Sequence, residues 1–538
     1  MSIGARGSRR DRSPRDRTAG TVVSLESAAR AGPPPPDTEV AESDPAAVRP
    51  GDAAAQASDG RAAARATGAM LASRLVIAAL GWTGSVIIAR TLSPEAWGHY
   101  TFVFALLGLM AIFTDLGVGR AVMAQLIVDE PDEVARTSSA FIALRLLLGL
   151  GGYVIAVGYV VVLQYPGEVI RATALAGLVI VFATPGHALT VVYQSRHRLA
   201  LSAVSESLGQ ALQLAVTIAA AFVAPYLLIF VLAPVLNEVL ALSIKTVGII
   251  RRDGGLRPSR HIDTARWRSM LLDAAPLAIG FALTIALQKV DMLLLSVLDT
   301  FDAVGVYGIG YKFSDILDTF VIAAAGPIAT LLVAAWPDEP GVFRQRCRSA
   351  AAAFGAGGAV AVAAFWPSAP QVVGLLYGDR FVQGALAARL LVLGAALTSL
   401  IVLGIYVLAS AGHARSYPVV ALGGLALNVA LNLVLIPRLS YDGAAIATVA
   451  TLATVLVALW IVVIRTLPII GMLPLGALST LAIVAAGVCV VGTVATRWVP
   501  WPAVSTATAL VVAGVALPLV RSCARTPGRH TKVQVSPS

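Results

Sequence analysis

Charged side chains occur within the long apolar segments of this sequence, and these are the residues with the clearest chemical potential. Five are cations: Arg74, Arg145, Lys289, Lys312 and Arg389. A charge inside a bilayer is costly, so it usually forms a pair or marks the path of a substrate or ion. Guanidinium suits bidentate contact with phosphate, and lysine acts as a point charge. The pattern therefore predicts that these five residues contact a bulky anionic substrate.

Acidic residues in the same segments are candidates for coupling transport to a proton or a cation. We assign this role to Asp115, Glu238 and Asp291. Asp115 also has a structural interpretation, because it can pair with Arg120 or Arg74. The sequence leaves both interpretations of Asp115 open.

Other charges in the apolar segments have simpler explanations. Lys312 and Asp315 are three residues apart, so on a helix they can neutralise each other. Arg120, Lys245 and Asp318 lie near the ends of their apolar segments, where long side chains reach the membrane surface or cap a helix. We expect these last three residues to be structural.

The apolar segments that position these charges are numerous. The chain is 57% hydrophobic and 13% charged, with a mean hydropathy of +0.80, whereas an average soluble domain has about 25% charged residues. Strand alternation is absent, and many runs approach the roughly 20 residues that span a bilayer as a helix. We predict an all-α polytopic membrane protein with about fourteen transmembrane helices, at 70–89, 99–121, 139–163, 171–193, 205–224, 226–250, 271–298, 304–334, 349–366, 386–411, 416–436, 443–465, 473–496 and 502–520.

Arginines in the loops predict how the chain crosses the membrane. With a cytoplasmic N-terminus, the inner loops are rich in arginine, above all the loop at 251–270, whereas five outer loops hold one arginine each. This bias predicts a multi-pass membrane protein with both termini in the cytoplasm. The expected divisions are a disordered tail without apolar periodicity at 1–66, a six-helix lobe at 67–250, a linker at 251–270, a second six-helix lobe at 271–466, two further helices at 467–521 and a tail at 522–538.

Two similar corners favour a repeated architecture. Leu92–Tyr100 and Leu298–Tyr307 each join two apolar helices through a short polar turn, and each contains Gly-x-Tyr, at Gly98 and Gly305. Each corner follows the first helix of its lobe, as in secondary transporters built from internal repeats. We predict that the corners are packing joints at the outer rim, and that the substrate contacts lie on the helices they connect.

Catalytic and cofactor motifs are missing from the sequence. It contains no P-loop, six histidines without metal-ligand spacing and three cysteines without metal or redox spacing. We therefore expect no enzymatic activity, metal or other cofactor. The outer loops are short and hold few acidic residues, which argues against a membrane-embedded polysaccharide polymerase but leaves it as an alternative.

Three blocks of sequence together resemble one family. They are TLSPEAWGHYTF at 91–102 followed by FTDLGVGRAV at 113–122, VDMLL at 290–294 followed by AVGVY at 303–307, and the stretch Ser410–Thr448 with Asn428 and Asn432 on one helix face. These blocks resemble prokaryotic polysaccharide flippases of the multidrug/oligosaccharidyl-lipid/polysaccharide exporter superfamily. The resemblance implies two six-helix lobes related by a pseudo-twofold axis, with alternating access between them.

The resemblance also implies a substrate. It would be an undecaprenyl-pyrophosphate-linked oligosaccharide, moved from the inner to the outer leaflet of the bacterial inner (plasma) membrane for exopolysaccharide, capsule or O-antigen (lipopolysaccharide) synthesis. The intramembrane cations would then accompany the pyrophosphate. The implied partners are the lipid-linked oligosaccharide, membrane lipids, a polysaccharide polymerase and a chain-length regulator, and no nucleic acid. A cation-coupled drug or metabolite antiporter of the same superfamily is the second interpretation.

Overall fold

The computed structural model describes residues 76–115, 118–119, 122–123, 126, 131–195, 199–252, 259, 262–467, 469 and 471–524. All of these residues belong to one of the two compact units of the chain, at 66–538. Every regular element in these ranges is helical, which confirms the predicted all-α class. The predicted tail at 1–66, Arg74 and Arg120 lie outside the described residues, as does the side chain of Asp115.

The N-terminal half begins with a short apolar helix, Val76–Thr91. It continues with α2 (Pro94–Asp115), α4 (Pro131–Val162), α5 (Gly167–Ala176), α6 (Leu178–Ser195), α7 (Leu199–Val223) and α8 (Leu227–Arg252). Pro185 and Pro234 lie inside α6 and α8. Such prolines are tolerated in membrane helices when neighbours satisfy the freed backbone groups.

The C-terminal half is built in the same way. It contains α9 (Ala265–Leu298), α10 (Phe301–Val333), α11 (Pro340–Phe365), α12 (Ala369–Tyr377), α13 (Ala385–Ser410), α14 (Tyr417–Thr466), α15 (Leu475–Ala495) and α16 (Trp501–Ala524), with short 3₁₀ turns at Asp379–Gly384 and Ala414–Ser416. The long α14 is kinked at Ser440, whose φ is 54°. The kink follows Pro437, which cannot donate a backbone hydrogen bond. The two arms of α14 therefore correspond to two predicted segments, at 416–436 and 443–465.

Ten helices in the described part of the chain are long and apolar enough to cross a membrane, and Val76–Thr91 is a shorter apolar helix. This supports a multi-pass membrane protein. The longest of the ten runs, Ala414–Thr466, contains the Ser440 kink. The number fourteen stays a prediction.

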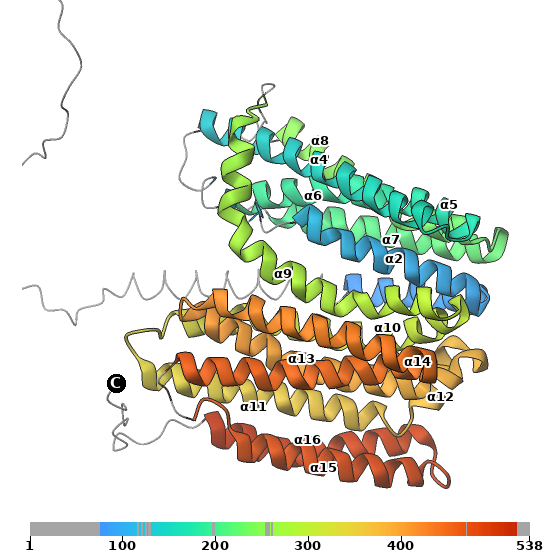
Figure 1. Cartoon of the computed structure of the whole chain (residues 1–538), viewed down its shortest axis with the longest axis vertical. Coiled ribbons are helices and arrows are strands. Elements are labelled where there is room, and N and C mark those ends of the chain that lie inside the picture. The colour runs from blue at the N-terminus through green and yellow to red at the C-terminus, as the bar shows by residue number, and fades with distance from the viewer. Residues whose placement is uncertain are drawn as a thin grey trace, which may run out of the picture. The chain divides into compact units, whose positions relative to one another are not determined.

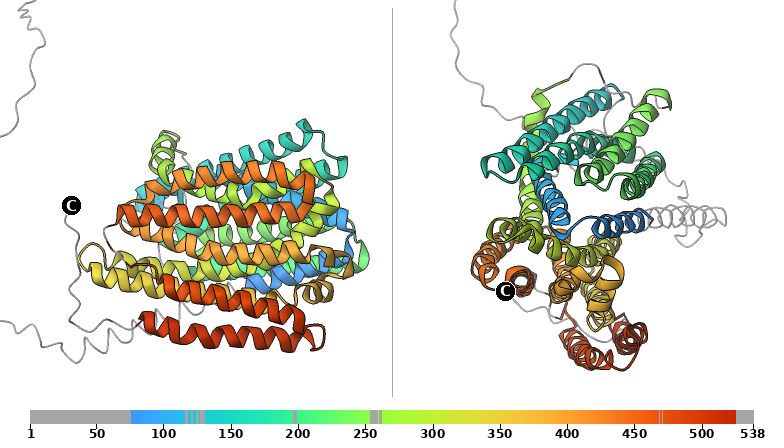
Figure 2. Two further views of the ribbon diagram at one scale, coloured as in Figure 1. Left: turned by 60° about the horizontal axis from the view of Figure 1, so that its bottom comes forward. Right: turned by 90° about the vertical axis from the view of Figure 1, so that its right-hand side faces the viewer.

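The helices form two groups with a central layer between them (Figure 1). Helices α4 to α8 gather on one side and α11 to α16 on the other, with α2, α9 and α10 between them. Figure 2 shows the same arrangement along the helix axes. The central helices join the groups, because α2 packs against α4 on one side, α10 packs against α13 on the other, and α2 contacts both α9 and α10.

The two predicted corners pack directly on each other where α2 begins beside α10. A Cβ on Gly98 would overlap the carbonyl oxygen of Phe301 and lie 2.8 Å from its carbonyl carbon. A Cβ on Gly305 would overlap the carbonyl oxygen of Pro94 and lie 3.1 Å from the backbone nitrogen of Gly98. Only glycine permits this backbone approach. We call this contact the Gly98–Gly305 joint.

Candidate functional site

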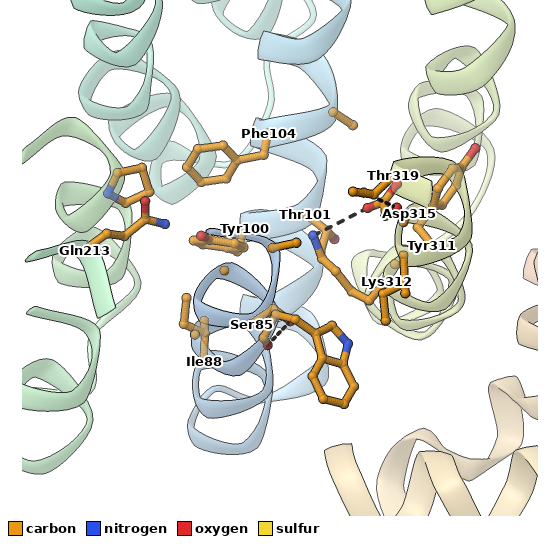
Figure 3. A pocket seen from close by; sticks show the side chains of 18 of the residues that line it. Ser85, Ile88, Tyr100, Thr101, Phe104, Gln213, Tyr311, Lys312, Asp315 and Thr319 are labelled. Carbon is orange, nitrogen blue, oxygen red and sulfur yellow. Dashed lines mark hydrogen bonds and ion pairs between the residues drawn. The ribbon is translucent and has the colours of Figure 1, made fainter. Parts of the chain in front are cut away.

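A cavity of about 720 Å³ lies between α7 and α8 of the first group and the central helices α2, α9 and α10. Its walls come from Val76–Thr91, α2, α7, α8, α9 and α10. Figure 3 shows Gln213 of α7 on one side, Lys312 and Asp315 of α10 on the other, and Tyr100 and Phe104 of α2 between them. A cavity of this size falls in the range of small-molecule sites. It fits part of a large substrate's headgroup.

Two of the five predicted cations, Lys289 and Lys312, line this cavity. The Lys289 ammonium lies 4.9 Å from the centroid of the Tyr311 ring, within the range of a cation–π contact. The Lys312 ammonium lies 4.0 Å from an Asp315 carboxylate oxygen, so the predicted i,i+3 pair does form. The distance between the two charged groups is long and both side chains are partly exposed, so the pair is weak. Lys312 can therefore still contact an anion in the cavity.

Asp291 lies behind the cavity wall and is fully buried. Its Oδ2 accepts hydrogen bonds from Tyr307 (2.6 Å), Tyr311 (2.6 Å) and Thr448 (3.0 Å). Its Oδ1 accepts one from the backbone N–H of Met292 at 2.7 Å. Tyr311 therefore connects the two environments, because its hydroxyl contacts Asp291 while its ring faces Lys289 in the cavity.

The Gly98–Gly305 joint lies beside one end of the cavity. The cavity begins next to the joint, at Tyr100 and Gly308, and follows α10 to Phe320, a rise of about 18 Å. That the corner residues are packing joints and not binding residues stays a prediction, and one of them reaches the cavity. Tyr100, the last residue of the first corner, faces the cavity, because it lies about half a helical turn beyond Gly98.

Two arginines add contacts between the first helix and the C-terminal half, at the first corner. Arg90, from the end of the first helix, donates to the backbone oxygens of Leu375 and Leu376 near the end of α12. In return, Arg380 donates to the backbone oxygens of Ala89 (2.9 Å) and Arg90 (2.5 Å). Carbonyls at helix C-termini lack intrahelical partners and carry partial negative charge, so each guanidinium satisfies them. These contacts tie the first helix to the C-terminal half.

Glutamines that the sequence analysis did not single out form the opposite wall. Gln210 and Gln213 of α7 line the cavity. The side-chain amide of Asn237, on α8, donates to the Oε1 of Gln213 at 2.8 Å and to that of Gln210 at 3.4 Å. A polar stripe on α7 was the available signal, because Ser202, Glu206, Gln210 and Gln213 recur every three or four residues on one helix face.

The same stripe explains why the prediction for Lys245 was wrong. Lys245 does not reach the membrane surface, because only 2% of the residue is exposed. Its ammonium lies 3.0 Å from Glu206 Oε1 and 3.0 Å from the Thr190 hydroxyl. Ser202 also donates to Glu206 Oε1, at 3.0 Å. Pairing inside the bundle replaces contact with the lipid headgroups.

The other predicted site residues do not line the cavity described above. Arg145 is buried and donates to the backbone oxygen of Thr114 at 2.6 Å. Arg389 donates to the backbone oxygen of Trp366 at 2.6 Å, with its guanidinium over the indole ring. Glu238 is half-buried on α8, next to Asn237. The structure thus brings together Lys289, Lys312 and, one layer behind them, Asp291.

Comparison with known proteins shows which family the N-terminal part of this architecture resembles. The model of a family described as polysaccharide biosynthesis protein matches residues 63–329. The predicted family resemblance is confirmed. This match covers the first helix through α9 and most of α10, and so includes every described helix that contributes to the cavity. Among curated proteins, none matches the chain in sequence.

Solved structures show the same fold. The lipid II flippase MurJ in an inward closed conformation matches with a TM-score of 0.68 and 12% identity, over 85% of this chain and 99% of that one. A multidrug resistance MATE family transporter of the MOP superfamily matches in its inward-facing conformation with a TM-score of 0.62 and 14% identity, over 73% and 98% of the two chains. An outward-facing structure of such a transporter matches with a TM-score of 0.52 and 14% identity, over 76% of this chain and 96% of that one. At these identities the likeness establishes the fold.

Proposed function

We propose that this chain flips an undecaprenyl-pyrophosphate-linked oligosaccharide from the inner to the outer leaflet of the bacterial plasma membrane by alternating access. The observation that carries the proposal is the pair of lysines, Lys289 and Lys312, in a cavity that lies within the part of the chain matched by the polysaccharide-biosynthesis family. Two amines can balance the charge of a pyrophosphate while its sugar shares the cavity. The flipped lipid would supply exopolysaccharide, capsule or O-antigen synthesis, with a polymerase and a chain-length regulator as partners.

The cavity and the Gly98–Gly305 joint together support alternating access. The joint and the Arg90 and Arg380 contacts hold one end closed, and the cavity extends away from them. With the predicted topology, the closed end faces outward and the substrate enters from the cytoplasmic side. Opening requires α2 and α10 to separate at the joint, a rearrangement of rigid groups that suits a repeat-based transporter.

Asp291 is our first candidate for the coupling residue. A fully buried carboxylate with three hydroxyl donors can hold a proton or a small cation, and Tyr311 links it to Lys289. An anion that draws Lys289 away from the Tyr311 ring would change the environment of Asp291 in the same step. Glu238 and Asp115 remain further coupling candidates, and Arg74, Arg145 and Arg389 remain candidate substrate contacts.

Complementation of a flippase-null strain tests the proposed function. We expect the wild-type chain to restore surface polysaccharide. Lys289→Ala should lower the initial rate at which surface polysaccharide appears by about 10- to 100-fold, because a hydrogen bond to a charged group contributes about 1.5–3 kcal/mol. Arg415→Ala removes an exposed cation outside the cavity and serves as the matched control. Membrane levels of each variant are measured alongside. A wild-type chain that reaches the membrane but restores no polysaccharide contradicts the proposal.

A cation-coupled drug antiporter is the second candidate, and the cavity gives it one specific support. Aromatic side chains such as Trp82, Tyr100 and Phe104 line the cavity and would also suit a flat organic cation. The two candidates differ in the effect of Lys289→Ala. Removing a positive charge should weaken export of an anionic lipid, whereas it should preserve or improve export of a cation such as ethidium. Ethidium efflux from whole cells measures this directly.

A further inference from the structure

The two walls of the cavity differ in chemistry. All its charged lining residues, Lys289, Lys312 and Asp315, come from α9 and α10. The wall formed by the first helix, α2, α7 and α8 has no charged residue among those described as lining the cavity. This wall instead offers the amides of Gln210 and Gln213. A ligand that touches both walls therefore meets cations on one side and neutral hydrogen-bonding groups on the other.

Asn237 determines which end of each glutamine faces the cavity. Its Nδ2 donates to the Oε1 atoms of both Gln210 and Gln213, so both carbonyl oxygens are already engaged. Asn237 can come this close because residue 209 is glycine: a Cβ there would overlap the side-chain oxygen of Asn237. Within the described residues, the NH₂ groups of the two glutamines have no protein partner that the structure assigns. Each NH₂ group has two N–H donors, which makes this wall a donor surface.

Aromatic rings lie next to these amides. Tyr100 and Phe104 project from α2 between the glutamine side and the lysine side (Figure 3). Sugars combine apolar C–H faces, which pack on aromatic rings, with hydroxyl and acetamido oxygens, which accept hydrogen bonds from amides. The combination of donor amides and rings thus matches a saccharide, whereas the two ammonium groups match the pyrophosphate.

We propose that the cavity has two subsites, one for the pyrophosphate and one for the sugar next to it. Lys289 and Lys312 bind the pyrophosphate. Gln210 and Gln213, which Asn237 orients and which lie beside Tyr100 and Phe104, bind the sugar and select an uncharged one. This inference rests on the proposed function and adds the substrate class. An acidic sugar would place its carboxylate against a wall without a cation. Asn237 is a positioning residue, because it acts through the two glutamines.

Binding to three defined lipids tests the two subsites. The full-length protein in detergent is titrated with undecaprenyl pyrophosphate, undecaprenyl pyrophosphate-glucose and undecaprenyl pyrophosphate-glucuronic acid. We expect the glucose lipid to bind most tightly and the glucuronic acid lipid to bind more weakly than the glucose lipid. In the Gln210→Ala/Gln213→Ala double variant, the preference for the glucose lipid over the sugar-free lipid should fall by roughly 5- to 30-fold, the effect of about two neutral hydrogen bonds.

Three further variants make the result specific. Lys289→Ala should weaken binding of all three lipids and leave the ratios between them nearly unchanged. Asn237→Ala should lower the sugar preference although Asn237 is not among the lining residues. Gln194→Ala removes an exposed glutamine of α6 outside the cavity and should match the wild type. A thermal melt of each variant confirms that it is folded.

The outcomes separate the two proposals. If the wild type binds none of the lipids, the proposed function itself fails. If it binds them but the double glutamine variant keeps the wild-type sugar preference, the sugar subsite is wrong while the flippase proposal stands. Equal affinity of the wild type for the glucose and glucuronic acid lipids would refute selection for an uncharged sugar.

Discussion

The Gly98–Gly305 joint provides the sharpest test of how this protein closes. We consider Gly305→Ala, which adds one methyl group where a Cβ would overlap the Pro94 carbonyl oxygen and lie 3.2 Å from its carbonyl carbon. Both neighbours are backbone atoms, so no side chain can rotate away and the two helices must separate. Overpacking of this kind costs about 1–3 kcal/mol. The helix preference of alanine over glycine does not offset this cost, because residue 305 lies within α10 and its helix propensity acts on closed and open states alike. The overlap therefore disfavours the closed state by about 1–3 kcal/mol.

This cost should shift the protein toward states in which the joint is open. A penalty of about 1–3 kcal/mol lowers the population of the closed state relative to open states by roughly 5- to 160-fold. Double electron–electron resonance between spin labels on Glu95 and Asp302, both exposed beside the joint, measures the separation. We expect the distance distribution of Gly305→Ala to gain a longer component.

A control on the same helix isolates the effect of the contact. Gly326 also lies in α10, but a Cβ there would meet nothing within 4 Å. Gly326→Ala should leave the distance distribution unchanged. If Gly305→Ala gives the wild-type distribution as well, the joint is not a close backbone contact that holds the closed end, and the reasoning is refuted.

Two further predictions concern the buried charges. Glu206→Gln removes the carboxylate that lies 3.0 Å from the Lys245 ammonium. We expect a loss of about 2 kcal/mol in stability, below the 3–5 kcal/mol of a fully buried pair, because 37% of the Glu206 side chain is exposed. Glu206→Gln/Lys245→Met should recover most of the loss in a thermal melt, whereas additive losses would contradict pairing. Asp291→Asn replaces one acceptor oxygen by a donor opposite hydroxyl groups, and we expect transport into proteoliposomes to lose its dependence on an imposed cation or proton gradient. A variant that keeps the wild-type gradient dependence would exclude Asp291 as the coupling residue.

The helices were predictable because long apolar runs have only one way to satisfy their backbone groups in a bilayer. The corners were predictable as a pair, since Gly98 and Gly305 occupy equivalent places in two similar stretches. The direct contact between the two corners was not predictable, because a sequence repeat does not show whether its two copies touch. The kink at Ser440 lies in the predicted gap between two apolar segments, at 416–436 and 443–465. The sequence did not predict that one helix, α14, continues across this gap.

Intramembrane charge identified the right kind of residue but not its surroundings. Lys289 and Arg389 look alike in the sequence, as single cations in apolar helices. The structure separates them, because Lys289 faces the cavity while Arg389 bonds to the Trp366 carbonyl. That difference depends on which helix packs beside each cation. The sequence of a single apolar segment does not contain this information. Neutral amides are harder still to identify, because they cost less in a membrane than a charge does. Gln210 and Gln213 become candidates only when α7 is placed opposite α10, across a cavity whose charges all lie on the other wall.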